Sequence, residues 1–415
     1  TLLRFGRKGD SASGWPESSM FNQPALESLL DRRARQLPGV RIRRGVEVTG
    51  IEQRHDHVIL RTAAGGDVSV RYAVGCDGAN STTRRLAGIA VHDLGFFYDW
   101  LIVDVVLHEP RVFDPPNLQI CDPVRPTTVV SGGPGRRRWE FMRLPHESLG
   151  ELNDETRAWE LLAPWEVTPA NASLERHAVY TFAARYAEQW RAGRVLLAGD
   201  AAHQMPPFAG QGMCAGIRDA ANLAWKLDLV LTGRADDDLL DCYEQERLPN
   251  ARAAIEFSME LGKVICVPDP AEAARRDEAM AASVGPEPTE VPPLPGLEAG
   301  LVHPSAPHAG HVFVQGTVDG RLFDDVHGAG WCLVAVEVDV TTIEPALRTW
   351  FESIGGRIVS LPRTEDAASR WFSERKLTWA LQRPDFHLYG AGTTAAGASA
   401  LLEDLRQRLA PAKAF

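Results

Sequence analysis

The first clear helical pattern along the chain follows Asn22. Apolar residues recur there near one face of a helix, at Leu26, Leu29, Leu30 and Leu37. Asn22 can cap this helix, a proline in its first turn is tolerated, and Pro38-Gly39 would end it. The pattern therefore predicts one helix before the first strands.

Alternation of apolar and polar residues then predicts two groups of strands. Runs at residues 41–48, 57–62 and 67–72, separated by polar or glycine-containing turns, are typical of an antiparallel meander leading into residues 72–78. A second β-rich region is expected at residues 96–107, 126–130 and 137–144, with a glycine-proline turn at 132–135.

Longer apolar segments follow in the middle of the chain. A helix is expected over the acidic stretch 151–162, and residues 173–190 approach a short buried strand at 194–200. This strand ends in Gly199-Asp200, and a glycine-rich turn then leads into a long apolar helix at roughly residues 212–231. The order of strand, glycine-rich turn and helix is typical of α/β ligand sites.

The last part of the chain predicts a separate α/β unit. Residues 266–305 are rich in Pro, Ala, Glu and Gly and indicate a linker with some helix. Beyond it we expect strands at 331–337 and 357–361, helices at 342–354 and 399–409, and a hairpin at 379–390 that turns at Pro384-Asp385. Because 415 residues exceed one usual core, more than one domain is expected.

Composition and charge narrow the class of protein. The formal net charge is −11 with 44% hydrophobic residues, which argues against nucleic acid as a partner. No run approaches the roughly 20 apolar residues of a membrane span, and the N-terminus lacks a signal-peptide region. We expect a cytoplasmic enzyme with six buried free thiols, because the scattered cysteines form neither a disulfide framework nor a metal motif.

Two segments carry candidate chemistry. Residues 75–85, with the sequence GCDGANSTTRR, run from a strand into a turn that contains Asp77 and Arg84. This turn can bring a carboxylate to a polar ligand, but an ordinary Asx-turn with a solvated Arg84 explains it equally simply. Residues 193–227 combine Asp200, two prolines and two glycines ahead of a helix N-terminus, which favours an anionic or electron-rich cofactor.

Together the two segments resemble the internal flavin fingerprints of the group A FAD-dependent aromatic hydroxylases. The sequences of residues 180–227 and of the segment RWEFMRLP are most similar to those of 3-(3-hydroxyphenyl)propionate hydroxylases and of relatives acting on other phenols or aromatic polyketides. The resemblance implies a mixed α/β fold in which residues 1–265 form an FAD-binding Rossmann-like domain interleaved with a β-sheet substrate domain. Residues 266–305 would be the linker, and residues 306–415 a thioredoxin-like domain without CxxC.

One part of the family pattern is missing. Family members begin with a strand, turn and helix carrying GxGxxG, which would hold the FAD pyrophosphate, and the chain begins at Thr1 without it. We therefore expect the FAD-binding domain to be incomplete at its N-terminus.

The resemblance implies roles for individual residues around the cofactor. Asp200 would hydrogen-bond the ribityl chain of FAD, with Gly199 allowing close approach, and Pro206 and Pro207 would lie beside the flavin at the substrate pocket. Amides of Gly210, Gln211, Gly212 and Met213 would face the pyrimidine edge. Asp77 and Arg84 would shape the approach of FAD and NAD(P)H, and Gln23 would contact the cofactor unless it is a surface glutamine.

Substrate residues are assigned with alternatives. Tyr180 matches a position where phenol hydroxylases place a tyrosine near the substrate hydroxyl, and a core tyrosine is the alternative. Arg143 would pair with a substrate carboxylate, although an exposed structural arginine is the simpler interpretation. His203 is expected to orient its loop. No residue is expected to bind a metal.

The predicted function is hydroxylation of a small phenolic substrate, resembling 3-(3-hydroxyphenyl)propionate, by FAD with NADH or NADPH and dioxygen. The family implies a flavin hydroperoxide that the ring attacks, in a site that excludes water. The alternatives are a hydroxylase of a polycyclic aromatic polyketide and a non-catalytic remnant or truncated fragment. A homodimer is compatible with the resemblance.

Overall fold

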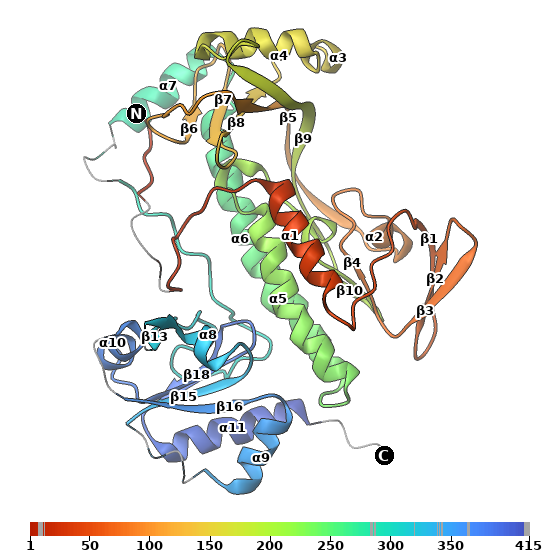
Figure 1. The fold of residues 1–415 in the computed structure, drawn as a ribbon, viewed down its shortest axis with the longest axis vertical. Coiled ribbons are helices and arrows are strands. Elements are labelled where there is room, and N and C mark those ends of the chain that lie inside the picture. The colour runs from red at the N-terminus through yellow and green to blue at the C-terminus, as the bar shows by residue number, and fades with distance from the viewer. Residues whose placement is uncertain are drawn as a thin grey trace.

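Two bodies of different size make up the fold, which is a computed structural model (Figure 1). It describes residues 1–6, 11, 13–282, 285, 288–318, 320–337, 339, 341, 343–362 and 366–410. The larger body contains the elements up to α7 (Pro270–Ala281), and the smaller one begins at β13 (Thr317–Val318). Both mix helices and sheets, which confirms the predicted fold class at this level.

Helix α1 (Gln23–Arg35) begins where the sequence predicts. The Asn22 side chain accepts a hydrogen bond from the Ala25 amide at 3.1 Å, as an N-cap does. None of its residues is buried, and Leu29 and Leu30 are each more than half exposed. The helix ends before Leu37, so the apolar stripe extends beyond it.

The first predicted strand, residues 41–48, is wrong. β1 (Val48–Gln53) begins where that strand was expected to end, and pairs antiparallel with β2 (Val58–Thr62), which pairs with β3 (Gly66–Val70). Residues 41–47 have only Ile42 and Val46 as apolar side chains among charged residues and a glycine, and none of the seven is buried. Alternation alone therefore does not place a strand in a sheet.

A small sheet joins distant parts of the chain. β4 (Ala73–Gly75) runs parallel to β11 (Val195–Leu197), whose other edge pairs with β10 (Arg191–Ala192). Helix α2 (Thr82–Leu86) follows β4 directly. The predicted strand before Gly199 is thus confirmed, and it lies next to the strand before Asp77.

A six-stranded sheet dominates the upper part of Figure 1, in the order β12, β9, β5, β8, β7, β6. Its strands are β5 (Val91–Leu107), β6 (Leu118–Ile120), β7 (Thr127–Ser131), β8 (Arg136–Met142), β9 (Ala172–Ala187) and β12 (His203–Gln204). One face packs against α3 (Leu149–Leu152) and α4 (Glu155–Leu162), and the other contacts α6 (Asp241–Ile265). The helix predicted over 151–162 is two helices, because Asp154 caps a new one.

Two long helices run side by side through the molecule. α5 (Gly212–Leu231) matches its prediction, and it packs on α6, a helix of 25 residues that was not predicted. Pro249 inside α6 and its many charged residues obscure the helical pattern. The short η4 (Asp237–Leu240) connects the two, and α7 lies in the region predicted as a linker with some helix.

The smaller body is built on a four-stranded sheet in the order β16, β15, β17, β18. Its strands are β15 (Cys332–Val336), β16 (Arg357–Leu361), β17 (Trp379–Gln382) and β18 (Leu388–Gly392). The pair β13 and β14 (Arg321–Leu322) and the helices α8 (Phe323–His327), α9 (Pro345–Ser353), α10 (Ala367–Glu374) and α11 (Ala395–Leu409) complete it. α10 was not predicted, α11 begins earlier than expected, and residue 342 of the helix predicted at 342–354 lies outside the described residues.

A cluster of buried charged and amide side chains joins the two bodies. We call it the domain cluster; it consists of Asn222, Lys226, Glu246, Arg383 and Asp385. Glu246 pairs with Lys226 at 2.7 Å and with Arg383 at 2.6 Å, and Arg383 pairs with Asp385 at 2.7 Å. The Asn222 amide also donates to Asp385 at 2.8 Å. Both α5 and α6 are therefore attached to the turn between β17 and β18.

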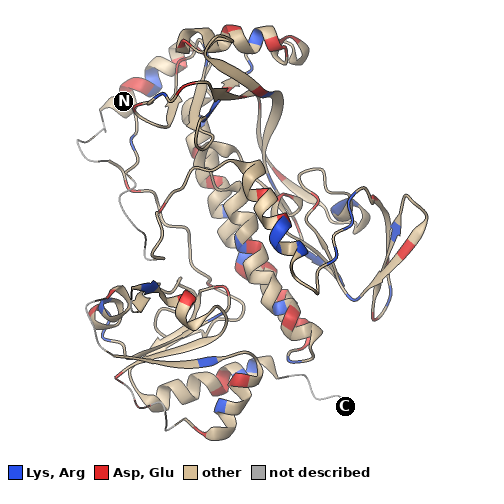
Figure 2. Cartoon of the chain, viewed as in Figure 1, with Lys and Arg blue, Asp and Glu red and all other residues tan. Residues whose placement is uncertain are grey.

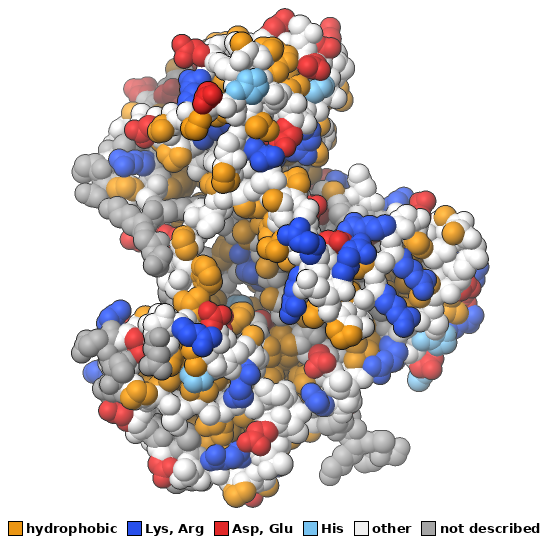
Figure 3. Space-filling view, in the orientation of Figure 1, with side chains coloured by type: hydrophobic (Ala, Val, Ile, Leu, Met, Phe, Trp, Pro, Cys, Tyr) orange, Lys and Arg blue, Asp and Glu red, His pale blue; other side chains and the backbone are white. Residues whose placement is uncertain are grey.

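Charge is unevenly distributed over the surface. Figure 2 shows residues of both signs along α5, whereas Figure 3 shows basic side chains gathered over the face that carries α1 and the β1–β3 sheet. Residues 32–44 alone contain six arginines and no acidic residue. Among the described residues, no helix combines the length and the apolar character needed to cross a membrane.

The expectation that all six cysteines are buried is wrong. All six are free thiols, but only Cys266 and Cys332 are buried, and Cys76 is exposed. Burial raises the pKa of the Cys332 thiol to about 12, so this group is not a reactive thiolate.

Candidate functional site

The two glycine-containing motifs lie side by side. β4 and β11 run parallel with Gly75 opposite Leu197, so their carboxyl ends meet at one edge of the sheet. The Ala198 amide donates to the Gly75 carbonyl at 3.0 Å. Arg84 Nη1 donates to the carbonyl of Ala201, 117 positions away, at 2.8 Å. The buried Arg84 is thus the side chain that joins the motifs.

Gly199 and Asp200 form the tight turn η2 (Gly199–Ala201) directly after β11. Gly199 has a φ of +60°, a left-handed conformation that a side chain makes costly. Asp200 is exposed, and its carboxylate makes no hydrogen bond or ion pair with any described residue. The turn therefore presents an unpaired carboxylate where ligands of α/β sheets bind.

A shallow recess beside this turn is lined mainly by charged and polar side chains. They include Arg84, Arg185, Asp200, His203 and Gln204. Although the Asp200 side chain reaches solvent, the protein around it partly desolvates its carboxyl and raises the pKa, and the charge of His203 offsets part of this effect. Burial, followed by the like charge of Arg185, lowers the pKa of Arg84. Arg84, Arg185 and His203 each have hydrogen-bond partners within the protein, whereas the Asp200 carboxylate has none among the described residues.

Pro206 and Pro207 lead from this turn toward helix α5. Pro207 begins the short η3 (Pro207–Ala209), and Gly210 ends it with a φ of +64°. A Cβ at Gly210 would meet no atom within 4 Å, so its surroundings are open and only the backbone conformation favours glycine there. The segment leads into α5 and leaves the first turn of that helix uncovered.

The N-terminus of α5 has no side-chain cap. Gln211 is the N-cap residue, but its side chain accepts a hydrogen bond from Arg218 Nη2 at 3.1 Å instead of capping an amide. The amides of Gly212 and Met213 at this end therefore have no side-chain acceptor. They lie at the positive end of a 20-residue helix dipole, which favours an anionic group.

Phe208 connects this loop to the six-stranded sheet. Its ring lies 5.6 Å from that of Trp100 and 6.0 Å from that of Phe182, and its carbonyl accepts from Gln119 Nε2 at 3.1 Å. A cavity of about 90 Å³ adjoins it, lined by Phe5, Gln119, Phe208, Ala209, Phe257, Leu261 and Val291. Apart from Gln119, its lining residues have apolar side chains, which suits contact with an aromatic ring.

Tyr180 and Arg143 lie on opposite faces of this sheet. Tyr180 pairs with Trp100 across β9 and β5, so it shares the face that contacts Phe208, although it does not line the cavity. It is 45% exposed, and its hydroxyl accepts from Arg176 Nη1 at 3.2 Å. Arg143 pairs with Asp99 at 2.9 Å on the other face. This favours the structural interpretation of Arg143.

Asp77 and Gln23 are engaged locally. The Asp77 carboxylate accepts from the Ser81 hydroxyl at 2.5 Å and from the Thr83 amide at 2.8 Å. Burial opposes its ionisation, but these hydrogen bonds outweigh burial and lower the pKa of Asp77. Gln23 is exposed and donates to Glu27 at 2.9 Å, in the first turn of α1. Neither contact requires a cofactor.

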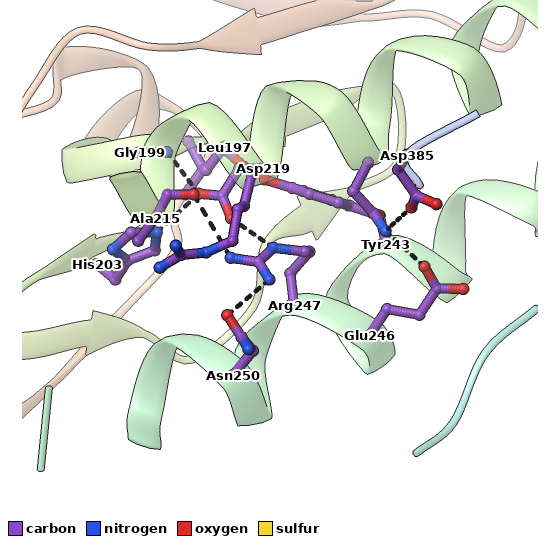
Figure 4. A network of polar contacts seen from close by, with 12 residues as sticks. Leu197, Gly199, His203, Ala215, Asp219, Tyr243, Glu246, Arg247, Asn250 and Asp385 are labelled. Atoms are coloured by element: carbon purple, nitrogen blue, oxygen red, sulfur yellow. Dashed lines mark hydrogen bonds and ion pairs between the residues drawn. The ribbon is translucent and has the colours of Figure 1, made fainter. Parts of the chain in front are cut away.

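The polar network beneath the turn was not predicted from the sequence (Figure 4). Asp219 of α5 accepts from the Gly199 amide and from His203, and it pairs with Arg247 of α6. The signal was present in part, because Asp219, Asn222 and Lys226 fall on one side of a mainly apolar helix at spacings of three and four. Arg247 could not be paired with it, since α6 itself was not recognised.

The residues present fit a flavin dinucleotide. An unpaired carboxylate at Asp200 can accept hydrogen bonds from a polyol chain, and the uncapped amides of α5 can face an electron-rich ring edge. The glycine at 199 permits close approach of the backbone, and the neighbouring cavity is apolar. Donors, acceptors and an apolar wall thus converge on one region.

Comparison with known proteins gives the same result. Residues 4–258 match the model of a protein family described as FAD binding domain. The chain is 41% identical over 421 residues to a probable NADH-specific resorcinol 4-hydroxylase from Rhodococcus jostii, covering 96% of this chain and 78% of that protein. It is 37% identical to a 3-(3-hydroxy-phenyl)propionate/3-hydroxycinnamic acid hydroxylase from Mycolicibacterium gilvum, over 85% of this chain and 65% of the relative.

Solved structures share the fold. The flavin-dependent monooxygenase PieE in complex with FAD and substrate superposes with a TM-score of 0.73 at 20% identity, covering 93% of this chain and 79% of that one. Aklavinone-11 hydroxylase with FAD and aklavinone gives 0.72 at 24% identity, over 98% and 87%. With the family match over more than half of its length, the chain belongs to the FAD binding domain family, as one of the FAD-dependent aromatic hydroxylases.

Proposed function

We propose that this protein is an FAD-dependent monooxygenase that hydroxylates a small phenolic substrate with NADH and dioxygen. One observation carries the proposal: the parallel pairing of β4 and β11 brings both flavin motifs to one sheet edge. There the unpaired Asp200 and the uncapped start of α5 lie near Phe208 and an apolar cavity. NADH is favoured as the reductant because the relative from Rhodococcus jostii is described as NADH-specific.

The chain's own residues bind, orient and shield. Asp200 would accept hydrogen bonds from the ribityl hydroxyls of FAD, and the amides of Gly212 and Met213 would stabilise negative charge at its pyrimidine edge. The chemistry that FAD would supply here is the uptake of electrons from NADH and the activation of dioxygen. Phe208 and Trp100 exclude water from the region where the ring binds. Tyr180 does not line the cavity but shares the sheet face that contacts Phe208, and in this proposal its hydroxyl would reach the phenol once substrate is bound.

The substrate we propose has a single ring. The named activities of the two relatives are resorcinol 4-hydroxylation and hydroxylation of 3-(3-hydroxyphenyl)propionate. Both are monocyclic phenols, and both are candidates here.

The test is oxygen-dependent NADH oxidation coupled to a hydroxylated product. The FAD-loaded protein is assayed with resorcinol, with 3-(3-hydroxyphenyl)propionate and with a multi-ring phenol, and products are identified by mass. We expect a monocyclic phenol to stimulate NADH oxidation and to gain one oxygen atom. The proposal fails if no phenol gains oxygen while the protein holds FAD, and the choice of ring size fails if only the multi-ring phenol reacts.

The domain assignment remains part of this proposal. We assign residues 1–265 to FAD and substrate binding, residues 266–305 to a linker and residues 306–415 to a thioredoxin-like domain. The parallel unit β15–α9–β16, followed by α10, the antiparallel β17–β18 hairpin and α11, supports the last assignment. We further propose a cytoplasmic protein that forms homodimers, which sedimentation would test.

A further inference from the structure

Asp219 is the centre of a buried polar cluster directly under the Gly199–Asp200 turn (Figure 4). Its carboxylate has three partners: the Gly199 amide at 2.9 Å, His203 Nε2 at 2.7 Å and Arg247 Nε at 2.9 Å. The side chains of Asp219 and His203 are fully buried, and that of Arg247 is almost so. Neither Asp219 nor Arg247 lines the recess beside Asp200. They therefore act on that region only through other groups.

The turn above this cluster depends on it for its conformation. Gly199 adopts a φ of +60°, and a glycine samples many other conformations when nothing holds it. The hydrogen bond from its amide to Asp219 fixes the peptide that precedes Asp200. On the other side of the turn, Arg84 holds the Ala201 carbonyl at 2.8 Å. Asp200 itself has no partner that could fix its direction.

His203 and Arg247 together keep the Asp219 carboxylate in its charged form. Burial opposes ionisation, but the hydrogen bond from His203 and the charges of His203 and Arg247 outweigh it and lower the pKa of Asp219. Arg247 is fixed in turn, because its Nη1 donates to Asn250 Oδ1 at 2.8 Å. The cluster thus supplies a rigid, negatively charged acceptor to the Gly199 amide.

The geometry points to Asp219 as a positioning residue for cofactor binding, supported by Arg247. It holds the left-handed turn at Gly199 and so aims the Asp200 carboxylate at the ribityl chain of FAD. The role of Asp200 in this inference rests on the proposed function. The role of Asp219 in holding the turn rests on hydrogen bonds within the chain itself. Asp219, on the buried side of α5, thus has a part in cofactor binding although it does not touch the ligand.

The test compares Asp219→Asn with a matched control, Asp385→Asn. Asp385 is an equally buried carboxylate with an arginine partner and an α5 contact, but it lies in the domain cluster. Two quantities are measured: amide hydrogen exchange of a peptide spanning residues 198–204 without FAD, and the FAD dissociation constant with the visible spectrum of bound flavin.

We expect exchange of the 198–204 peptide to rise about tenfold or more in Asp219→Asn, because its amide loses a charged acceptor. The FAD dissociation constant should increase by roughly tenfold to a hundredfold, with a shifted flavin spectrum at saturation. In Asp385→Asn, the exchange of this peptide and the affinity should stay within about twofold of the unsubstituted protein, whatever the loss in melting temperature.

A second variant guards against misfolding of the first. Arg247→Gln leaves the Asp219 carboxylate in place and removes the charge that supports it, so we expect smaller changes in the same direction. Unchanged exchange and unchanged FAD affinity in Asp219→Asn, or in Arg247→Gln if the former does not fold, would overturn the inference. Equal effects in Asp385→Asn would also overturn it.

Asp200→Ala separates this inference from the proposed function. If Asp200→Ala binds FAD as the unsubstituted protein does, the assigned cofactor role of Asp200 fails. Exchange at residues 198–204 still decides whether Asp219 holds the turn. If Asp200→Ala loses affinity and Asp219→Asn does not, only the positioning role fails.

Discussion

At Gly216 the contact between α5 and the cofactor turn leaves little room for a side chain. A Cβ there would lie 3.3 Å from the Cα of Gly199, closer than nearly all such contacts. Gly216 and Asp219 thus fix the same turn in different ways. Gly216 lets the turn pack closely because it has no side chain, and Asp219 holds the turn with its charged carboxylate. Residues of α5 therefore help to determine the conformation of the turn.

Gly216→Ala tests this contact. The added methyl group must push α5 and the turn apart by a few tenths of an ångström, so we expect FAD affinity to fall about fivefold, with a small loss of stability. Affinity is measured by flavin titration. The control is Gly150→Ala in α3, where a Cβ meets no atom within 4 Å, and where affinity should not change. Equal FAD affinity in the two variants would contradict the prediction.

Glu140 in β8 is a buried carboxyl with weak compensation. Burial raises its pKa to about 7, and Arg138, at 4.0 Å, lowers it only partly. A carboxyl whose pKa is higher in the folded than in the unfolded protein binds its proton more tightly when folded. Stability is therefore full below the usual value of 4.5 and is lost as pH rises toward and past 7.

Glu140→Gln should remove this loss of stability at high pH. Compared with the unsubstituted protein, the variant should gain roughly 3 kcal/mol in free energy of unfolding at about pH 8.5 and little at about pH 4.5. Urea unfolding at both pH values measures the difference. Glu175→Gln, at a half-exposed pair with Arg136, serves as control and should show no such trend. A constant difference across pH would rule out the shifted pKa.

At the scale of elements, α6 ties the flavin motif to the rest of the fold. The buried Tyr243 hydroxyl donates to the carbonyl of Leu197, the last residue of β11, at 2.8 Å. Burial raises the pKa of Tyr243 well above its usual value, so the group stays a neutral donor. The strand that leads into the turn is thus held by a helix that begins 44 residues later.

Tyr243→Phe removes this donor and leaves the Leu197 carbonyl without the phenol. We expect a loss of about 1 to 2 kcal/mol in free energy of unfolding, with little change in packing since the ring remains. Denaturant unfolding measures it. A loss below the error of the method would show that water replaces the hydroxyl.

Elements with a local signal were predictable, and elements defined by distant partners were not. Asn22 marks α1 and the glycine-rich turn marks α5, because caps and turns are encoded nearby. Strand 41–48 failed because its alternation had no surface to cover, and α6 failed because Pro249 and buried charges mask its period. The motif residues around Asp200 could be named, but Asp219 and Arg247 required the three-dimensional arrangement.

At the scale of the whole molecule, the domain cluster determines how the two bodies are joined. Arg383 is fully buried in the turn between β17 and β18 and reaches Glu246 of α6. Burial opposes ionisation of Glu246, but Arg383 and Lys226 outweigh it and lower its pKa to about 2. Glu246 thus pairs with one cation from each body, Lys226 of α5 and Arg383 of the turn between β17 and β18.

Arg383→Met should be severely destabilising. It leaves the Glu246 and Asp385 carboxylates buried with Lys226 as the remaining cation, at a cost of about 3 to 5 kcal/mol. Calorimetry would then show a lowered melting temperature, and the smaller body would separate first. Arg375→Met, at a more exposed pair with Glu374, should change little. Similar melting of the two variants would contradict a structural role for the cluster.

The same cluster constrains how this architecture can be recombined. Arg383 and Asp385 lie two residues apart in one turn and form a matched set of charges, while Lys226 and Glu246 form the complementary set. A C-terminal body transplanted from a related protein would be accepted only if its hairpin turn brings an equivalent pair. The residues at these few positions must therefore match between the two bodies. Chimeric proteins whose turn between β17 and β18 carries the pair should be soluble, and those that lack it should be insoluble.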